Sequence, residues 1–360
     1  MMRLPEFVFQ APRGIAEAVD LLAGAKPGEA MLVAGGTDLL PNMKRRQQVP
    51  RTLISLRRCE ELRGMGPSTR EHTASVGAGF VIGAGMTLTE IVRDDRIRKS
   101  FGALWQAAAQ VATPHLRNMG TIGGNICLDT RCNYYDQNYE WRKAIDFCMK
   151  KDDRAAERGA QQLCWVATSS PKCLAVSSTD TAPALIALGA EVQLAGPSGI
   201  RRIPLQAFYR NDGIAYLTRG AGEIVTDVHL PPQDGWRSTY WKLRRRGAFD
   251  FPVLSVAAAA QIDRDGTVRA ARIVLGAVAS QPIESRDAAV ALIGRPLTDV
   301  AIAEASEVAA KPARPMDNTD FTLHWRKRVT RDFVGYALRE VRGDDVRELR
   351  RRVSRQELIK

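Results

Sequence analysis

Five of the six cysteines in this 360-residue chain lie in one stretch, which begins at Cys127 and ends at Cys173. The glycine-bearing run Thr121 to Asn125 leads directly into this stretch, and Asp180 opens an apolar helical segment soon after it. Because the first residues show no signal-peptide pattern, we expect a cytoplasmic protein with reduced thiols. Clustered thiols in such a setting indicate a metal-binding insert rather than a disulfide framework.

The residues alone leave the identity of the metal open. Four thiolates hold either an iron–sulfur cluster or a zinc ion. Zinc sites usually use close C-x₂₋₄-C pairs, and the insert at residues 128–175 has none. The pattern therefore favours iron and sulfide, with zinc as the alternative.

Two glycine-rich turns each follow an apolar segment. Residues 34 to 38 (Ala-Gly-Gly-Thr-Asp) come after the predicted strand Met31 to Val33, and residues 115 to 125 follow a predicted helix. Paired glycines allow positive φ and a close approach of the backbone to a ligand. Loops of this kind bind phosphate through backbone N–H groups, although neither matches a Rossmann or P-loop fingerprint. Both are candidate pyrophosphate-binding turns.

Composition and charge narrow the class of protein. The chain is 45% apolar and 26% charged, which is typical of a globular protein with more than one domain. Its longest apolar run, near Phe251 to Ala260, is too short to cross a bilayer. The net charge of +12 is concentrated near the C-terminus, in an amphipathic helical pattern that predicts a solvated basic face or a docking surface. We find no nucleic-acid-binding motif and expect no membrane association.

Hydrophobic patterning predicts alternating helices and strands. Strands are expected at Phe7 to Phe9, Met31 to Val33, Arg51 to Leu56, Phe80 to Gly85 and Arg269 to Ala279. Helices are expected at Pro12 to Ala23, from Leu88 with Thr87 as N-cap, at Gly102 to Val111 and at Asp287 to Ile293.

The two glycine turns carry a family resemblance. VAGGTDLLP (residues 33–41) and RNMGTIGGNI (residues 117–126) resemble the two FAD-binding loops of molybdenum-hydroxylase flavoprotein subunits, the group of xanthine dehydrogenase and carbon monoxide dehydrogenase. The similarity runs from Phe7 to about Ala279. It implies FAD contacts at Val33, Ala34, Gly35, Gly36, Thr37, Asp38, Asn118, Thr121, Gly123, Gly124, Asn125, Asp180 and Lys242. For Lys242, a basic residue of no special role on a strand is the alternative.

The cysteine-rich insert narrows this resemblance. Its segments at residues 127–137, 141–151, 164–167 and 172–176 resemble the beta subunit of 4-hydroxybenzoyl-CoA reductase, which carries a [4Fe-4S] cluster beside FAD. The resemblance implies four metal ligands, Cys132, Cys148, Cys164 and Cys173, separated by 15, 15 and 8 residues. Cys127 is expected to pack as a small buried residue. The middle spacing exceeds the family's, so residues 151–162 are expected to form an expanded surface loop.

The resemblance also implies a function for the chain. It would be an electron-transfer subunit without catalytic residues of its own, passing electrons from ferredoxin through [4Fe-4S] and FAD to a [2Fe-2S] small subunit and a molybdopterin-containing large subunit. The complex, a dimer of heterotrimers, would reduce 4-hydroxybenzoyl-CoA to benzoyl-CoA. The alternatives are the FAD and [4Fe-4S] subunit of a molybdenum aldehyde or xanthine-type dehydrogenase, and a zinc-stapled scaffold without redox chemistry.

The fold implied is α+β. We expect a two-subdomain FAD-binding fold of the vanillyl-alcohol-oxidase (PCMH) type over residues 1–221, divided at residue 56, with the cluster insert at 128–175. A C-terminal α+β domain of the carbon monoxide dehydrogenase flavoprotein type would span 222–325. A basic helical tail would occupy 326–360.

Overall fold

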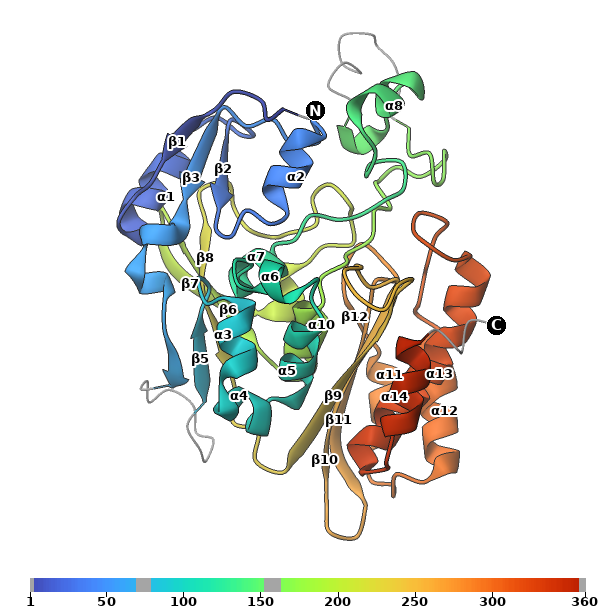
Figure 1. Cartoon of the computed structure of the whole chain (residues 1–360). Helices are drawn as coiled ribbons and strands as arrows, with labels where there is room; N and C mark the ends of the chain where they lie inside the picture. Colours follow the sequence, from blue (N-terminus) through green and yellow to red (C-terminus); the bar gives the residue numbers. More distant parts are fainter. Residues whose placement is uncertain (1–2, 69–78, 152–162, 356–360) are drawn as a thin grey trace.

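The computed structural model describes residues 3–68, 79–151 and 163–355 and contains three β-sheets (Figure 1). The N-terminal sheet and the middle sheet flank the two glycine loops. The third sheet lies beyond helices that pack on the middle one. The insert forms a separate lobe around helix α8, Tyr139–Ala144, at one end of the molecule.

The N-terminal subdomain is a parallel sheet in the order β1-β3-β2. Its strands are β1, Val8–Gln10, β2, Ala30–Val33, and β3, Thr52–Ser55. Helix α1, Ile15–Ala23, packs on this sheet, and α2, Leu39–Lys44, follows β2. The helix predicted from Pro12 begins only at Ile15, because Gly14 is extended and serves as its N-cap. The predicted strands at residues 31–33 and 51–56 are confirmed.

The middle sheet is antiparallel and has the order β4-β5-β8-β6-β7. Its strands are β4, Met65–Pro67, β5, Phe80–Gly83, β6, Glu191–Gly196, β7, Gly199–Pro204, and β8, Ile224–Leu230. Sequence analysis predicted a domain boundary after residue 221. Strand β8 lies beyond that position and hydrogen-bonds inside this sheet, between β5 and β6.

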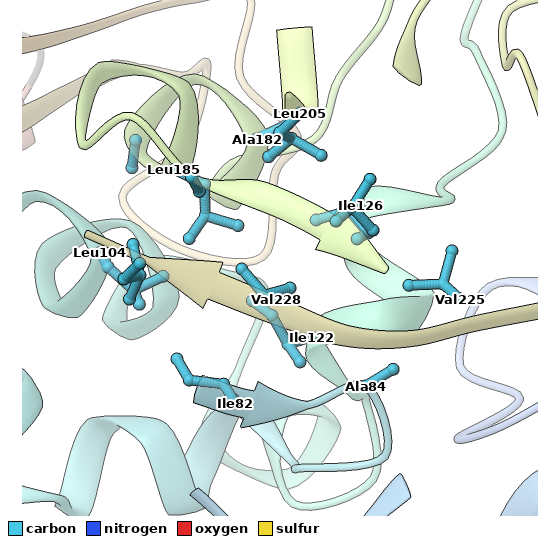
Figure 2. Packing of buried hydrophobic residues seen from close by; sticks show 14 of the residues in the cluster. Ile82, Ala84, Leu104, Ile122, Ile126, Ala182, Leu185, Leu205, Val225 and Val228 are labelled. Carbon is cyan, nitrogen blue, oxygen red and sulfur yellow. The ribbon is translucent and has the colours of Figure 1, made fainter. Parts of the chain in front are cut away.

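Helices from two parts of the chain share a hydrophobic core with the middle sheet. They are α3, Leu88–Arg93, α4, Asp95–Ser100, α5, Gly102–Ala109, α6, Pro114–Arg117, α7, Ile122–Ile126, and α10, Thr181–Ala187. Figure 2 shows their shared core, in which Ile82 of β5 and Val228 of β8 lie close to Ile122 of α7. Thr87 caps α3 as predicted, in a full capping box with Glu90.

The C-terminal sheet is antiparallel and has the order β12-β11-β10-β9. Its strands are β9, Trp236–Leu243, β10, Leu254–Ile262, β11, Val268–Gly276, and β12, Ile283–Glu284. Helices α5 and α10 contact one face (Figure 1). Strand β10 carries four consecutive alanines and is buried on both sides, because small side chains let helices approach from both faces.

The other face of this sheet is covered by the last helices. They are α11, Arg286–Val290, α12, Asp299–Ala310, α13, Leu323–Arg342, and α14, Arg347–Ser354. In α13 the predicted apolar stripe packs inward, with Phe333, Ala337 and Val341 buried. Arg326 is also fully buried and donates to three backbone carbonyls, so this basic segment is partly interior.

Short 3₁₀ helices complete the chain: η1, Leu56–Arg58, η2, Glu60–Leu62, η3, Met149–Lys151, and η4, Leu205–Phe208. Over the described ranges, no helix has the length and apolar character that a bilayer crossing requires.

Candidate functional site

A long cleft runs between the N-terminal and middle subdomains. It consists of two adjoining cavities of about 750 Å³ and 360 Å³. Ala34 and Gly35 of the first glycine loop, and Thr121 and Gly124 of the second, line both. Each volume falls in the range of cofactor sites, and their continuity suits an elongated ligand.

The two loops approach each other at glycine positions. A side chain at Gly35 would overlap the carbonyl of Met119, which belongs to the second loop. Gly36 has a φ of +69°, in the left-handed region that favours glycine. Gly123 lies against Ala84, and a Cβ there would come within 2.8 Å of that residue's carbonyl oxygen. Gly35 is therefore required for the two loops to meet, and the local backbone and packing favour glycine at Gly36 and Gly123, independently of any ligand.

Polar side chains fix the second loop. Thr121 caps α7 by accepting a hydrogen bond from the N–H of Gly124 at 3.0 Å. The Asn125 side-chain oxygen accepts from the Thr179 hydroxyl at 2.9 Å and from the N–H and hydroxyl of Thr181 at 3.1 and 2.6 Å. The glycine loop is thus tied to the chain that leaves the insert.

The structure brings twelve of the thirteen predicted FAD-contact residues to the cleft: Val33, Ala34, Gly35, Gly36, Thr37, Asp38, Asn118, Thr121, Gly123, Gly124, Asn125 and Asp180. Lys242 is different, because it is not among the residues that line either cavity. Its side chain is fully buried on β9 behind Asp180, and Nζ lies 3.0 Å from the Asp180 carboxylate and 3.1 Å from the carbonyl of Gln110.

Asp180 and Lys242 form a buried ion pair, to which the Tyr240 hydroxyl also donates at 2.6 Å. Burial raises the pKa of the Asp180 carboxyl and lowers that of the Lys242 amine, and their mutual attraction opposes both changes. Lys242 accordingly supports the position of Asp180 at the wall of the cleft.

Sequence reasoning missed several residues that line the cleft. Asp129 and Arg131, between the second loop and the first predicted metal ligand, reach the smaller cavity, together with Phe249 and Phe251 of the β9–β10 connection. Arg131 lies over the Phe251 ring at 4.6 Å. The available sequence signal for Asp129 and Arg131 was the presence of charged residues between two cysteines, Cys127 and Cys132. No local pattern marks the two phenylalanines.

The four predicted metal ligands converge. Cys132, Cys148, Cys164 and Cys173 line one small cavity of about 10 Å³, shared with Tyr135, Lys150 and Trp165 among others. Three of the four are buried, and Cys148 is half-buried. Cys127 lies elsewhere, in the wall of the cleft.

Burial dominates the chemistry of these thiols. It raises the pKa of Cys132 to about 12 and that of Cys173 to about 11, and it also raises the pKa of Cys148. Neutral thiols of this kind become ligands by exchanging their protons for a metal. Within the described ranges, no three metal-binding side chains are grouped closely enough for a metal ion. The donor set that lines this cavity consists of four cysteines, which are the ligands of both zinc sites and iron–sulfur clusters.

The insert is anchored to the cleft at its base. Arg131 and Val176 pair as an antiparallel bridge through two backbone hydrogen bonds, in which the nitrogen and oxygen atoms are 2.8 and 2.7 Å apart. The Arg131 guanidinium forms an ion pair with Asp38 of the first loop and lies 3.5 Å from Asp136. Asp136 in turn accepts from the N–H of Cys132 at 3.1 Å. One buried arginine therefore connects the cleft to the cysteine cavity. The predicted expanded loop, at residues 152–162, lies outside the described residues.

A cleft between two subdomains, walled by glycine loops and followed by a separate C-terminal sheet, defines a two-subdomain nucleotide-cofactor flavoprotein. Family models assign the chain directly: residues 5–233 match the FAD binding domain in molybdopterin dehydrogenase, and residues 238–341 match the CO dehydrogenase flavoprotein C-terminal domain. The chain belongs to the family of FAD-binding subunits of molybdenum-hydroxylase-type dehydrogenases.

Individual relatives of this chain are consistent with that family. The aldehyde oxidoreductase FAD-binding subunit PaoB of Escherichia coli is 33% identical over 310 residues, which cover 84% of this chain and 92% of that protein. The carbon monoxide dehydrogenase medium chain of Hydrogenophaga pseudoflava is 28% identical over 87% of this chain and 89% of its own length. A solved structure of carbon monoxide dehydrogenase from the same organism superposes with a TM-score of 0.74 at 26% identity, covering 94% of this chain and 98% of that one.

Proposed function

We propose that this chain is an electron-transfer subunit that holds FAD in the cleft and a [4Fe-4S] cluster at Cys132, Cys148, Cys164 and Cys173. The observation that carries the proposal is the convergence of these four cysteines on one cavity, in an insert that is bonded to the first glycine loop. Bound FAD exchanges one or two electrons and an iron–sulfur cluster exchanges one, so the pair converts between the two.

The residues of the cleft suit FAD. Glycine loops supply close backbone approach for a pyrophosphate, and the two cavities together offer the length of a dinucleotide. The larger cavity is also lined by Arg57, Arg63 and Arg219, which give it a positive wall for phosphate. The first proposed role of the chain's own residues is thus to bind and orient the cofactor.

A cluster is favoured over zinc by the arrangement of the cysteines. One zinc ion draws four sulfurs to about 2.3 Å from a common centre. The four cysteines lack the close C-x₂₋₄-C pairs that are usual at zinc sites, although they surround the same cavity. Four irons and four sulfides occupy more space between their thiolates, and the cysteine side chains must turn outward to accept them.

The test of this proposal is metal and flavin analysis of the chain purified without oxygen. We expect about four irons per chain, as for one [4Fe-4S] cluster, and noncovalent FAD that is released by acid. Serine at Cys132, Cys148, Cys164 or Cys173 should remove the iron, whereas Cys59→Ser and Cys127→Ser should retain it. Zinc without sulfide in the parent protein, or full iron in all four variants, contradicts the cluster.

The substrate belongs to a partner subunit, and two classes of complex are candidates. Similarity to an aldehyde oxidoreductase subunit at 33% identity supports an aldehyde-oxidising complex. The four-cysteine insert supports a 4-hydroxybenzoyl-CoA reductase, in which ferredoxin supplies the electrons. We place the aldehyde-oxidising class first, because its support covers 84% of the chain rather than the insert alone.

Both candidates imply the same partners: a molybdopterin-containing large subunit and a [2Fe-2S] small subunit, assembled as a dimer of heterotrimers. The assembled complex should be assayed in both directions. Oxidation of an aldehyde with an artificial acceptor supports the first candidate. Reduction of 4-hydroxybenzoyl-CoA by reduced viologen, without aldehyde oxidation, supports the second.

A further inference from the structure

A buried lysine lies between the cleft and the cysteine cavity. Lys150, in η3 and two residues after Cys148, has a side chain that is only 6% exposed. Its Nζ donates to the Asp129 carboxylate at 2.7 Å, to the Thr130 hydroxyl at 2.6 Å and to the carbonyl of Gly213 at 2.7 Å. An ammonium group has three N–H donors, and here each has an acceptor.

These contacts compensate for the burial of the Lys150 amine. A buried ammonium is costly unless it is paired and hydrogen-bonded, and the Asp129 carboxylate, 8% exposed, supplies the opposite charge. The rings of Tyr135 and Tyr216 add cation–π contacts at 4.8 and 5.5 Å. Three acceptors and two aromatic faces form a built site for one positive charge.

The pair is oriented between the two sites. Lys150 itself lines the cysteine cavity, whereas Asp129 lines the cleft and not that cavity. The positively charged residue of the pair therefore borders the cysteine cavity, and the negatively charged residue borders the cleft.

We propose that Lys150 raises the reduction potential of the cluster held by the four cysteines, and that the Asp129–Lys150 pair thereby sets the potential difference between the cluster and the flavin. This inference rests on the proposed function. On reduction, one electron from the donor adds one negative charge to a group that four thiolates already make negative. A fixed positive charge at the wall of a buried cavity stabilises that added charge, because the low dielectric there screens it little.

Substitutions of opposite sign test the proposal. Lys150→Met removes the positive charge with similar side-chain length, and Asp129→Asn removes its counter-charge. Lys150→Arg keeps the charge, and Lys143→Met, on the exposed face of α8, is the matched control for net charge. Each full-length protein is titrated anaerobically with dithionite, and the reduced cluster is measured by electron paramagnetic resonance.

The expected shifts are specific. Lys150→Met should lower the equilibrium constant for one-electron reduction of the cluster about tenfold, which corresponds to about 59 mV. Asp129→Asn should raise the potential, and Lys150→Arg and Lys143→Met should leave it close to that of the parent. Equal potentials in the parent, Lys150→Met and Asp129→Asn overturn the proposal, as does an equal shift in Lys143→Met.

Iron analysis separates this inference from the proposed function. If the parent protein contains no four-iron cluster, the proposed function fails and takes the inference with it. If the parent contains the cluster and the potentials do not move, the inference alone fails. Should Lys150→Met lose its iron, the opposite shift expected of Asp129→Asn still decides the question.

Discussion

Some glycines in the cleft allow the two loops to pack together, and others leave room for the cofactor. Substitutions should separate these two roles. At Gly35 a methyl group would overlap the Met119 carbonyl, whereas at Gly124 the nearest atom to a new Cβ is the Thr121 hydroxyl oxygen at 3.2 Å. We expect Gly35→Ala to lower the Tm of the apoprotein, because the two loops can no longer meet. Gly124→Leu should leave the Tm within a few degrees and abolish FAD binding, because its side chain extends into both cavities.

Thermal unfolding and flavin fluorescence of the two variants measure these effects. Gly28→Ala is a suitable control, since Gly28 borders the larger cavity but a methyl group at this position would have nothing within 4 Å; its φ of +81° costs about 1 kcal/mol by itself. Normal FAD content in Gly124→Leu would show that the second loop does not approach the cofactor.

The buried pair of Asp180 and Lys242 yields a prediction about stability. Lys242→Met leaves the Asp180 carboxylate without its cation in a fully buried site, which we expect to lower the free energy of unfolding by about 3–5 kcal/mol. The double variant Asp180→Asn, Lys242→Met should recover a substantial part of that loss. Urea denaturation measures both, and a single variant as stable as the parent would contradict the buried ion pair.

At this scale the sequence predicted residues that stand in compact motifs. The glycines, Thr121 and Asn125 were predicted because their neighbours form recognisable runs, and the four cysteines because the insert resembles that of a known family. Lys242 shows the limit: it lies 62 residues from Asp180 in sequence, and only the β9 strand brings the two together. Its partner is a carboxylate at the wall of the cleft, which no local pattern reveals.

Among the elements, α3 offers the clearest test of local energetics. The Thr87 hydroxyl accepts from the N–H of Glu90 at 3.2 Å, and the Glu90 carboxylate accepts from the N–H of Thr87 at 2.7 Å. Thr87→Ala should lower the free energy of unfolding by about 1 kcal/mol, the usual value for a helix N-cap. Thr87→Ser keeps the hydroxyl and should restore most of it. Chemical denaturation measures both, and equal losses would mean that the cap contributes nothing.

Helices and strands were predicted correctly where the hydrophobic pattern was strong. They were missed where tertiary contacts determine the local structure. The strand at 80–85 and the helix at 102–111 were found within a few residues of their ends. The glycine loop at 115–125 contains α6 and the start of α7, although glycine is a poor helix former. Thr121 caps α7, and the close contact of Gly123 with Ala84 requires glycine, so packing overrides propensity there.

For the whole molecule, the net charge of +12 allows a test of the second candidate under Proposed function, in which ferredoxin is the electron donor. An acidic ferredoxin is attracted over distances that salt screens, with a Debye length of about 8 Å at physiological ionic strength. We expect the rate at which reduced ferredoxin delivers electrons to the holoprotein to fall several-fold between low and high salt. Stopped-flow absorbance measures it. Methyl viologen, a cation, is the control and should not slow, and a ferredoxin rate independent of salt would contradict steering.

The two ends of the cysteine-rich insert lie side by side at its base. Arg131 and Val176 pair through two backbone hydrogen bonds, as neighbouring strands do in a hairpin, so everything between them leaves and re-enters the fold at one place. A segment with adjoining ends is gained or lost without displacing its host. The cysteine lobe therefore has adjoining ends, and a tight turn joining Arg131 to Val176 is expected to remove the four cysteines while the FAD-binding domain still folds.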